Sequence, residues 1–220
     1  TGVDLPGESC GIMFDYKNFH ELEQATVAFG QGISVTPLQL VSAISACVNG
    51  GYLLQPHILK EVRNNNNEII YQAKRKVKRQ VIKEETAKKV RDALESVVTD
   101  GGGRNAYIDG YRIGGKTGTA QKAVNGSYVG GGYILSFVGI APIDDPQIVL
   151  YIAMDNPKNC IQYGGTTVAP IARKMLLDIL PALNVKKVKS QRQKSFSVMD
   201  KKTIKVENYI GKQRKEVQNI

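Results

Sequence analysis

Apolar residues recur at helical spacing in three separate stretches of the chain. After Thr36, a good helix-capping residue that is followed by proline, the apolar positions predict a helix that Asn49-Gly50-Gly51 ends. The same spacing predicts a second helix over Glu84 to Val98 and a third from about Thr167 to Leu180. The apolar stripes of the first two helices predict that they pack against the core.

Strand-forming residues dominate residues 111–119 and two later runs, Tyr133 to Ala141 and Gln147 to Met154. Glycines 130–132 and the proline-flanked turn 142–146 join these runs. The pattern predicts a three-stranded antiparallel meander.

A separate hairpin is predicted between the first two helices. Tyr52 to Val62 and Glu68 to Tyr71 have the composition of strands, and the run Asn64 to Asn67 fits the turn between them. The order of helices and antiparallel strands indicates an α+β fold, in which an antiparallel sheet packs with helices.

Residues 110–121, Gly-Tyr-Arg-Ile-Gly-Gly-Lys-Thr-Gly-Thr-Ala-Gln, fit two incompatible motifs. Gly110 to Thr117 matches the phosphate-loop pattern G-x-x-x-x-G-K-[ST], which requires a helix that begins at the lysine. The apolar run Ile148 to Asp155, which ends in an acid, even imitates the magnesium-holding strand of that motif. Two glycines, two threonines and an Asn-Gly turn disfavour a helix over Lys116 to Ser127. A strand is therefore favoured, and nucleotide binding becomes the least favoured function.

As a strand, this segment suits a peptide ligand. Alternation places Thr117 and Thr119 on one face, where their hydroxyls could hold a carboxylate. Gly118 allows another backbone to approach closely, and an edge strand can pair with an extended peptide. Lys116 is expected to point to the opposite face of the strand, so a local twist of the strand is needed to bring its side chain to the same ligand.

Three motifs, in order along the chain, resemble those of one protein family. Lys116 to Gln121 resembles the third motif of the penicillin-binding serine transferases. Thr1 to Glu8 is similar to the family segment that follows the active-site helices, and Phe29 to Leu40 is similar to a further family signature. From Thr1 to about Pro181 the chain resembles the C-terminal part of a class B penicillin-binding protein, a serine D,D-transpeptidase domain with the serine β-lactamase-like fold.

The resemblance implies acyl transfer to a serine from the D-alanyl-D-alanine stem peptides of peptidoglycan, with β-lactams as substrate mimics and with no cofactor. The family nucleophile lies in a Ser-x-x-Lys motif and a second motif reads Ser-x-Asn, and neither motif occurs in this sequence. We therefore expect a fragment whose partner is the missing N-terminal half. Loss of a serine nucleophile costs on the order of a millionfold in turnover, so the chain alone should be inactive.

The resemblance also implies roles for individual residues. Lys116 would polarise the serine of the Ser-x-Asn motif, and the amide of Thr119 would be one oxyanion donor. The Thr117 and Thr119 hydroxyls would hold the substrate carboxylate, while the family places the glycine loop after residue 162 near the cleft. The substrate-binding residues expected from the shared strand and this loop are Thr117, Gly118, Thr119, Gln121, Tyr163 and Gly164.

The positive charge is concentrated at the C-terminal end. Residues 183–220 hold eleven Lys or Arg and three Asp or Glu, a net +8, whereas residues 1–182 hold nineteen and seventeen, a net +2. We predict a transpeptidase part over 1–182, a basic linker over 183–203 and a truncated segment resembling a PASTA repeat over 204–220. The linker is predicted to be a solvated spacer, because stacking aromatic residues are missing there. A contact for anionic envelope polymers or lipid headgroups is the less favoured alternative, and no nucleic-acid partner is expected.

The remaining residue types do not indicate a metal or disulfide framework. The three cysteines are odd in number and far apart in the sequence, so a disulfide framework is not indicated. A zinc site could be assembled from Cys10, Asp15, His20 and His57, but these residues lack the closely spaced ligand pairs that are typical of zinc sites. No apolar run approaches the roughly twenty residues of a membrane span, so we expect a soluble fragment. The resemblance implies that the parent is anchored at the extracytoplasmic face of the bacterial membrane.

Two classes of function remain open. The chain is either part of an acylating enzyme or a non-catalytic module that binds envelope polymers through its basic tail. Because the family sheet receives strands and helices from the missing half, we expect an unpaired sheet edge and an uncovered apolar face, and hence dimerisation or domain swapping of the fragment.

Overall fold

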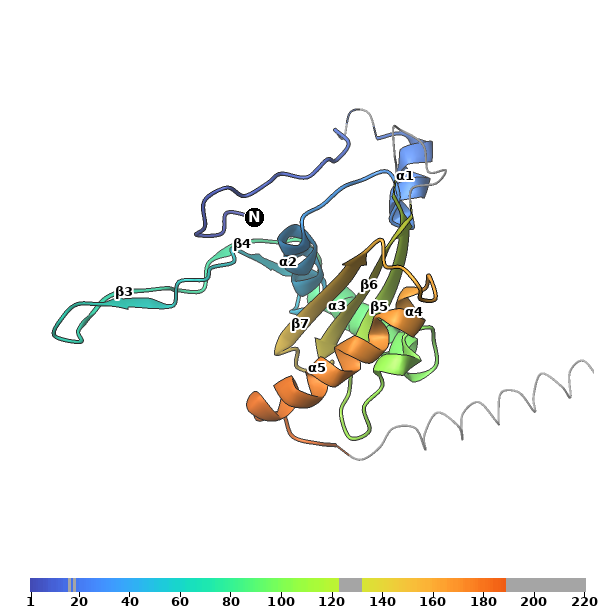
Figure 1. Ribbon diagram of the computed structural model, residues 1–220. Coiled ribbons are helices and arrows are strands. Elements are labelled where there is room, and N and C mark those ends of the chain that lie inside the picture. Colours follow the sequence, from blue (N-terminus) through green and yellow to red (C-terminus); the bar gives the residue numbers. More distant parts are fainter. Residues whose placement is uncertain (16, 18, 123–131, 189–220) are drawn as a thin grey trace, which may run out of the picture.

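The computed structural model describes residues 1–15, 17, 19–122 and 132–188. Its centre is an antiparallel sheet of three strands in the order β5 (Gly114–Gln121), β6 (Tyr133–Ala141) and β7 (Ile148–Asp155). Helices cover both faces, so the α+β prediction and the antiparallel meander are confirmed (Figure 1).

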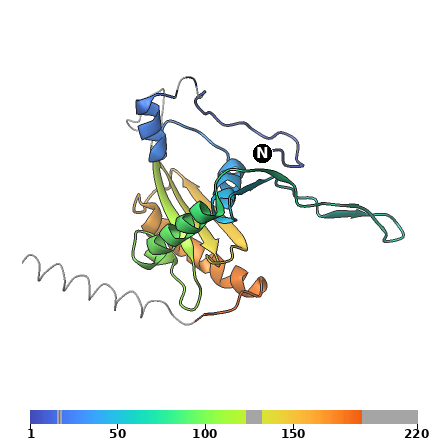
Figure 2. The same ribbon diagram turned by 180° about the vertical axis from the view of Figure 1, so that it is seen from behind.

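The two faces of β6 make two halves of the core. Leu135 and Phe137 point to one face and pack with Leu176 of α5 (Ala169–Ala182). Val138 and Ile140 point to the other face, which α2 (Pro37–Val48) and α3 (Glu84–Thr99) cover. Figure 2 shows α3 lying across the sheet on the side opposite to α5. A central strand buried on both faces explains why β6 is an almost unbroken apolar run.

The predicted helix ends are largely confirmed. Thr36 caps α2 through a capping box with Gln39, and α3 begins and ends within one residue of the prediction. The last predicted helix, from about Thr167 to Leu180, corresponds to α5. A short helix that was not predicted, α4 (Gly164–Thr167), precedes it and meets it at Val168. Proline at position 170 lacks an N–H and fits only the first turn of a helix, so α5 starts afresh just before it.

A long hairpin, residues 58–80, projects from the body and is called the hairpin arm below (Figure 1). Strand β2 (Glu61–Arg63) pairs with β3 (Ile69–Gln72) around the predicted asparagine turn. At the base of the arm, β1 (Tyr52–Leu54) pairs with β4 (Val77–Gln80). The single strand predicted over residues 52–62 is thus wrong, because two short strands with different partners replace it. Only one of the four residues of β4 is apolar, so the composition of this segment did not predict a strand.

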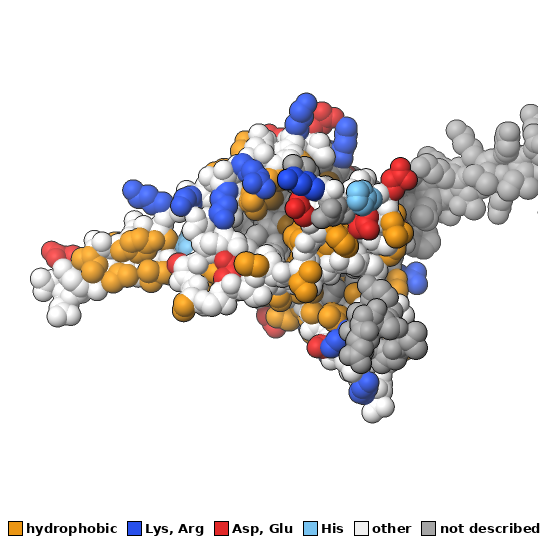
Figure 3. Space-filling model, turned by 90° about the horizontal axis from the view of Figure 1, so that it is seen from above, with side chains coloured by type: hydrophobic (Ala, Val, Ile, Leu, Met, Phe, Trp, Pro, Cys, Tyr) orange, Lys and Arg blue, Asp and Glu red, His pale blue; other side chains and the backbone are white. Residues whose placement is uncertain are grey.

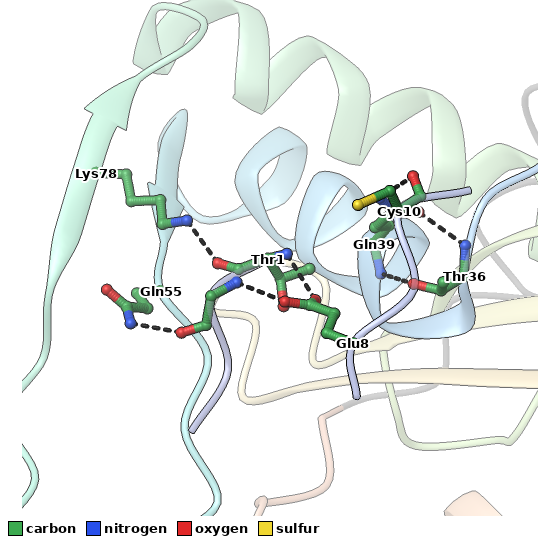
Figure 4. Close-up of polar contacts among 8 residues, drawn as sticks. Thr1, Glu8, Cys10, Thr36, Gln39, Gln55 and Lys78 are labelled. Atoms are coloured by element: carbon green, nitrogen blue, oxygen red, sulfur yellow. Dashed lines mark hydrogen bonds and ion pairs between the residues drawn. The ribbon is translucent and has the colours of Figure 1, made fainter. Parts of the chain in front are cut away.

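The N-terminal segment is fastened to α2 and to the base of the hairpin arm. The Gln39 side chain donates to the carbonyl of Cys10 at 2.8 Å, and the Lys78 ammonium donates to the carbonyl of Thr1 at 2.5 Å (Figure 4). The carboxylate of Glu8 accepts from the Thr1 hydroxyl and, at 2.8 Å, from the Gly2 amide.

Asp4 makes the second clamp of this segment. Its two carboxylate oxygens accept the amides of Ile58 at 2.7 Å and Leu59 at 3.0 Å, where the chain enters the hairpin arm. These two N–H groups hold the pKa of Asp4 below its ordinary value of 3.8.

Two further elements complete the described part of the chain. Helix α1 (Glu21–Ala28) stands beyond the tips of β5 and β6, and η2 (Arg104–Ala106) is a short turn after α3 (Figure 1). None of the helices in the described residues is long and apolar enough to cross a membrane.

The C-terminal segments lie partly outside the described residues. The chain that leaves α5 turns back, and the amide of Val188 donates to the carbonyl of Gly110 at 2.8 Å. The Lys187 ammonium lies 5.8 Å from the centre of the Tyr111 ring. The predicted basic linker is described only as far as this contact, and the PASTA-like segment lies outside the described residues.

Truncation of Phe137 should show how much stability the central strand provides. Phe137 is fully buried, so Phe137→Ala should lower the free energy of unfolding by about 3–5 kcal/mol through lost burial and a residual cavity. Lys174→Ala, at an exposed position on α5, should change it by less than about 0.5 kcal/mol. Chemical denaturation measures both, and equal effects of the two substitutions would contradict this description of the core.

The Asp4 clamp should depend on pH. A carboxylate whose folded pKa is depressed stabilises above its unfolded pKa, and that contribution is lost as pH falls through the lower folded value. The Ile58 and Leu59 amides should therefore stay bonded at neutral pH and be released only as pH falls through the folded pKa of Asp4, which lies below 3.8. Asp4→Asn should speed their hydrogen exchange already at pH 7, whereas Asp178→Asn on α5 should not. Unchanged exchange in the Asp4 variant would rule out the clamp.

Candidate active site

The motif Lys116-Thr117-Gly118-Thr119 lies in the middle of β5, an edge strand of the central sheet. Lys116 pairs with Val138 of β6, and Thr119 pairs with Leu135. Within the described residues, the other edge of β5 binds no strand. The predicted edge strand is therefore confirmed, and the phosphate-loop interpretation is wrong, because a helix does not begin at Lys116.

Strand alternation separates the side chains as predicted. Thr117 pairs with Phe137 and Thr119 pairs with Leu135, so both threonines lie on the sheet face that packs against α5. Lys116 pairs with Val138 and therefore lies on the opposite face. The exposed Lys116 ammonium donates to the carbonyl of Thr117 at 2.8 Å, along its own strand. The lysine is thus held at the strand edge without a carboxylate partner among the described residues.

An ion pair fixes the entry to this strand. Arg112, which precedes β5, donates to both carboxylate oxygens of Glu95 on α3, at 2.9 and 2.6 Å. Its guanidinium also lies 3.4 Å from the carboxylate of Asp144 in the turn between β6 and β7. Glu95 raises the pKa of Arg112 above its ordinary value, so the charge is permanent. The strand that carries the motif is consequently tied to α3 just before it becomes an open edge.

The predicted glycine loop packs directly on the motif. Gly164 lies so close to β5 and β6 that a β-carbon there would overlap the carbonyl oxygens of Gly118 and Ser136. A β-carbon on Gly118 would in turn overlap the hydroxyl of Ser136. Only glycine fits at Gly164 without moving a backbone, because both obstacles there are main-chain atoms.

A chain of hydrogen bonds joins this loop to the threonine. The Gly164 amide donates to the hydroxyl of Thr119 at 3.2 Å. The Asn105 side chain donates to the carbonyl of Gly165 at 2.8 Å and so anchors the loop from η2. The structure thereby places Gly118, Thr119 and Gly164 together. Asn105 was missed, because a single asparagine in a glycine-rich turn carries no signal of its distant partner.

The other predicted site residues lie around this centre. Tyr163 precedes the close glycine and remains partly exposed, with its hydroxyl against Gly102. Gln121 lies at the far end of β5, where its amide approaches the Tyr133 hydroxyl at 3.5 Å. Gln121 lies two positions beyond Thr119, the residue that contacts Gly164. It is therefore the predicted residue of β5 that lies farthest from that contact along the strand.

Among the residues with described positions, no three His, Cys, Asp or Glu side chains gather closely enough to hold a metal ion. Cys10, Cys47 and Cys160 are free thiols, and burial raises the pKa of Cys47. The arrangement instead offers an open strand edge, two hydroxyls and one ammonium, which suit an extended peptide that ends in a carboxylate.

Comparison with known proteins agrees with this geometry. The model of the penicillin binding protein transpeptidase domain family matches residues 1–177. Stage V sporulation protein D of Bacillus subtilis (strain 168) is 50% identical over 221 residues, which cover 100% of this chain and 34% of that protein. The probable peptidoglycan D,D-transpeptidase PenA of Neisseria flavescens is 35% identical over 186 residues, which cover 84% of this chain and 44% of that protein.

Solved structures show the same likeness. The transpeptidase domain of Burkholderia pseudomallei penicillin-binding protein 3 has 37% identity and a TM-score of 0.71, over 84% of this chain and 54% of that chain. Penicillin-binding protein 3 from Mycobacterium tuberculosis in complex with ampicillin has 31% identity and a TM-score of 0.78, over 86% of this chain and 44% of that chain.

These relatives are longer than the sequence described here. The chain spans about a third of the sporulation protein and less than half of the Neisseria protein. Its similarity nevertheless runs through the motif strand, the glycine loop and the helices that support them. The family match over residues 1–177 shows that this chain belongs to the penicillin-binding protein transpeptidase domain family.

Proposed function

We propose that this chain supplies the substrate-binding strand of a peptidoglycan D,D-transpeptidase that cross-links stem peptides through an acyl-serine intermediate. The observation that carries this proposal is the open edge of β5, with Lys116, Thr117 and Thr119 on it and the glycine loop packed behind. The printed names of the relatives, which include peptidoglycan D,D-transpeptidases, support the same reaction.

In the proposed reaction the stem peptide lies along the open edge of β5. The Thr117 and Thr119 hydroxyls bind the carboxylate of the terminal D-alanine, and the Gly164 amide orients the second hydroxyl. A serine from the rest of the longer protein attacks the D-alanyl carbonyl, and the terminal D-alanine leaves with a proton. The Thr119 amide stabilises the oxyanion, and an acceptor amine then displaces the serine.

Lys116 has a separate task in this scheme. Its ammonium now reaches only the carbonyl of Thr117, so it is available to a hydroxyl approaching from the open side. We assign to it the polarisation of a serine in the part of the protein that lies outside this sequence. A β-lactam follows the same path, because its strained amide replaces the scissile peptide bond and acylates the same serine.

Exposed apolar side chains and an unpaired strand edge support the proposal that another part of the protein packs against this chain. Large apolar side chains are exposed along the N-terminal part of the chain and around α1, namely Ile12, Met13, Leu22 and Phe29. The outer edge of β7 also binds no strand among the described residues. We propose that the remaining part of the transpeptidase covers this face and this edge, and that a second copy of the chain occupies them when that part is absent.

The domain limits and the place of action follow from the same proposal. Helix α5 ends at Ala182, which supports a transpeptidase part over residues 1–182 and a basic connecting segment beyond it. Peptidoglycan lies outside the cytoplasmic membrane, so we place the reaction at the outer face of that membrane. Anionic envelope polymers remain the proposed contacts of the basic segment.

Reconstitution should test the proposal. Mixing this chain with the part of the protein that carries Ser-x-x-Lys should restore covalent labelling by a fluorescent penicillin, whereas each part alone should stay unlabelled. Lys116→Ala should slow labelling on the order of 10²–10⁴-fold, and Lys88→Ala on the exposed face of α3 should not. Failure of both the mixture and the full-length protein to label would refute the assignment.

The glycine loop gives a second test. Gly164→Ala should slow labelling about 10- to 100-fold in the reconstituted protein, because the new methyl group pushes the loop from β5 and displaces the Thr119 hydroxyl. Thr166→Ala, at an exposed position in α4, should leave the rate within about twofold of the parent value. Equal rates for the two variants would show that the loop does not orient the threonine.

A further inference from the structure

The hairpin arm exposes apolar side chains on both of its faces. Ile69, Ile70 and Tyr71 follow one another in β3 and are 47%, 65% and 48% exposed. Successive residues of a strand point to opposite faces, so neither face of this ribbon is covered. A hairpin of two strands is marginally stable by itself in water, and an exposed apolar surface of this kind is typical of an interaction site.

The same arm is strongly basic. Residues 58–80 hold seven Lys or Arg and two Asp or Glu, which gives a net charge of +5. Most of this charge lies in the run Lys74-Arg75-Lys76-Val77-Lys78-Arg79, where all six residues are exposed. In the described residues, Lys74, Lys76 and Arg79 form no ion pair, and Arg75 lies only against the Tyr52 ring.

The arm stands apart from the rest of the molecule. Both ribbon views show it projecting beyond α2, with no other described element along its outer half (Figure 1, Figure 2). Seen from above, apolar side chains and Lys or Arg side chains lie side by side along it (Figure 3). The free edges of β2 and β3 bind no further strand among the residues that the structure places.

We propose that the hairpin arm is a docking site for a partner protein that adds an acidic, partly apolar strand to β3. Main-chain pairing along the free edge supplies affinity, while apolar side chains of the partner cover Ile70 and Tyr71. Carboxylates of the partner lie against the basic run at residues 74–79 and set its orientation.

Other occupants fit these observations less well. A second copy would bring two arms of charge +5 together, and like charges on an edge strand oppose pairing. A flat lipid bilayer would contact only one face of the ribbon and would leave the other face exposed. A soluble polyanion would neutralise the lysines but would bury no apolar surface. The combination of two exposed apolar faces and a basic run therefore favours a protein.

Peptide binding tests the inference with a defined probe. A short synthetic peptide with three consecutive valines flanked by glutamates places valine on both faces of an added strand. It should bind the chain in fluorescence anisotropy, and it should slow hydrogen exchange at residues 69–72. The peptide in which serine replaces valine should bind at least about tenfold more weakly, because it covers no apolar surface. Affinity should fall as salt is added, since the charges are exposed.

Matched variants locate the site. Lys74→Glu with Lys76→Glu should weaken binding about tenfold or more, and so should Ile70→Ser with Tyr71→Ser. Lys158→Glu with Lys174→Glu carries the same charge change at exposed positions outside the arm and should keep the parent affinity. Circular dichroism checks that every variant retains the parent fold, which is expected because the arm lies outside the core.

Three results would overturn the inference. The first is that the valine peptide does not bind, and the second is that the serine peptide binds as tightly as the valine peptide. The third is that the chain binds phosphatidylglycerol vesicles in preference to the peptide and that the arm substitutions abolish this vesicle binding. The second result would indicate a soluble polyanion, and the third would indicate a membrane surface. None of them bears on the acylation chemistry, because Lys116, Thr117 and Thr119 are unchanged in these variants.

Discussion

Burial of β6 between two helical layers is the constraint on which the rest of the structure depends. Because Leu135 and Val138 must point to opposite layers, the strand cannot slip in register without placing apolar groups at the wrong face. β5 then has a fixed partner on one side and an open edge on the other. The position of the lysine and threonines at that edge is thus a consequence of core packing, and no loop has to hold them there.

The same constraint explains why the glycine loop can reach the motif. Helix α5 packs on one face of β6, and the short helix before it must cross the backbones of β5 and β6 closely. Glycine at position 164 removes the β-carbon that would prevent this approach, and its amide becomes a donor for Thr119. Packing and ligand orientation therefore depend on the same few atoms, which couples the stability of this corner to its chemistry.

Much of the central fold could be predicted from local patterns. The meander was visible because each strand is a run of strand formers bounded by glycine or proline, and α2 was visible from Thr36-Pro37 and the glycines after it. The pairing of β1 with β4 was not predicted, because it joins residues far apart in sequence and uses a basic strand. The short helix α4 was not predicted, because its four residues are two glycines and two threonines, which carry little helical signal.

The candidate site was predictable to the extent that its residues share a strand. Alternation alone placed Thr117 and Thr119 together, whereas Tyr163 and Gly164 came from a family resemblance, and Asn105 could be found only in three dimensions. Long-range contacts of this kind depend on how layers stack, which single-sequence patterns do not encode.

The contact between Val188 and Gly110 has a mechanical consequence. Together with the stacking of Lys187 on Tyr111, it returns the chain to the body after α5 has ended. Residues 187 and 188 are therefore positioned beside the segment that leads into β5. The strand that carries the motif and the chain that leaves α5 are consequently linked through the same few residues.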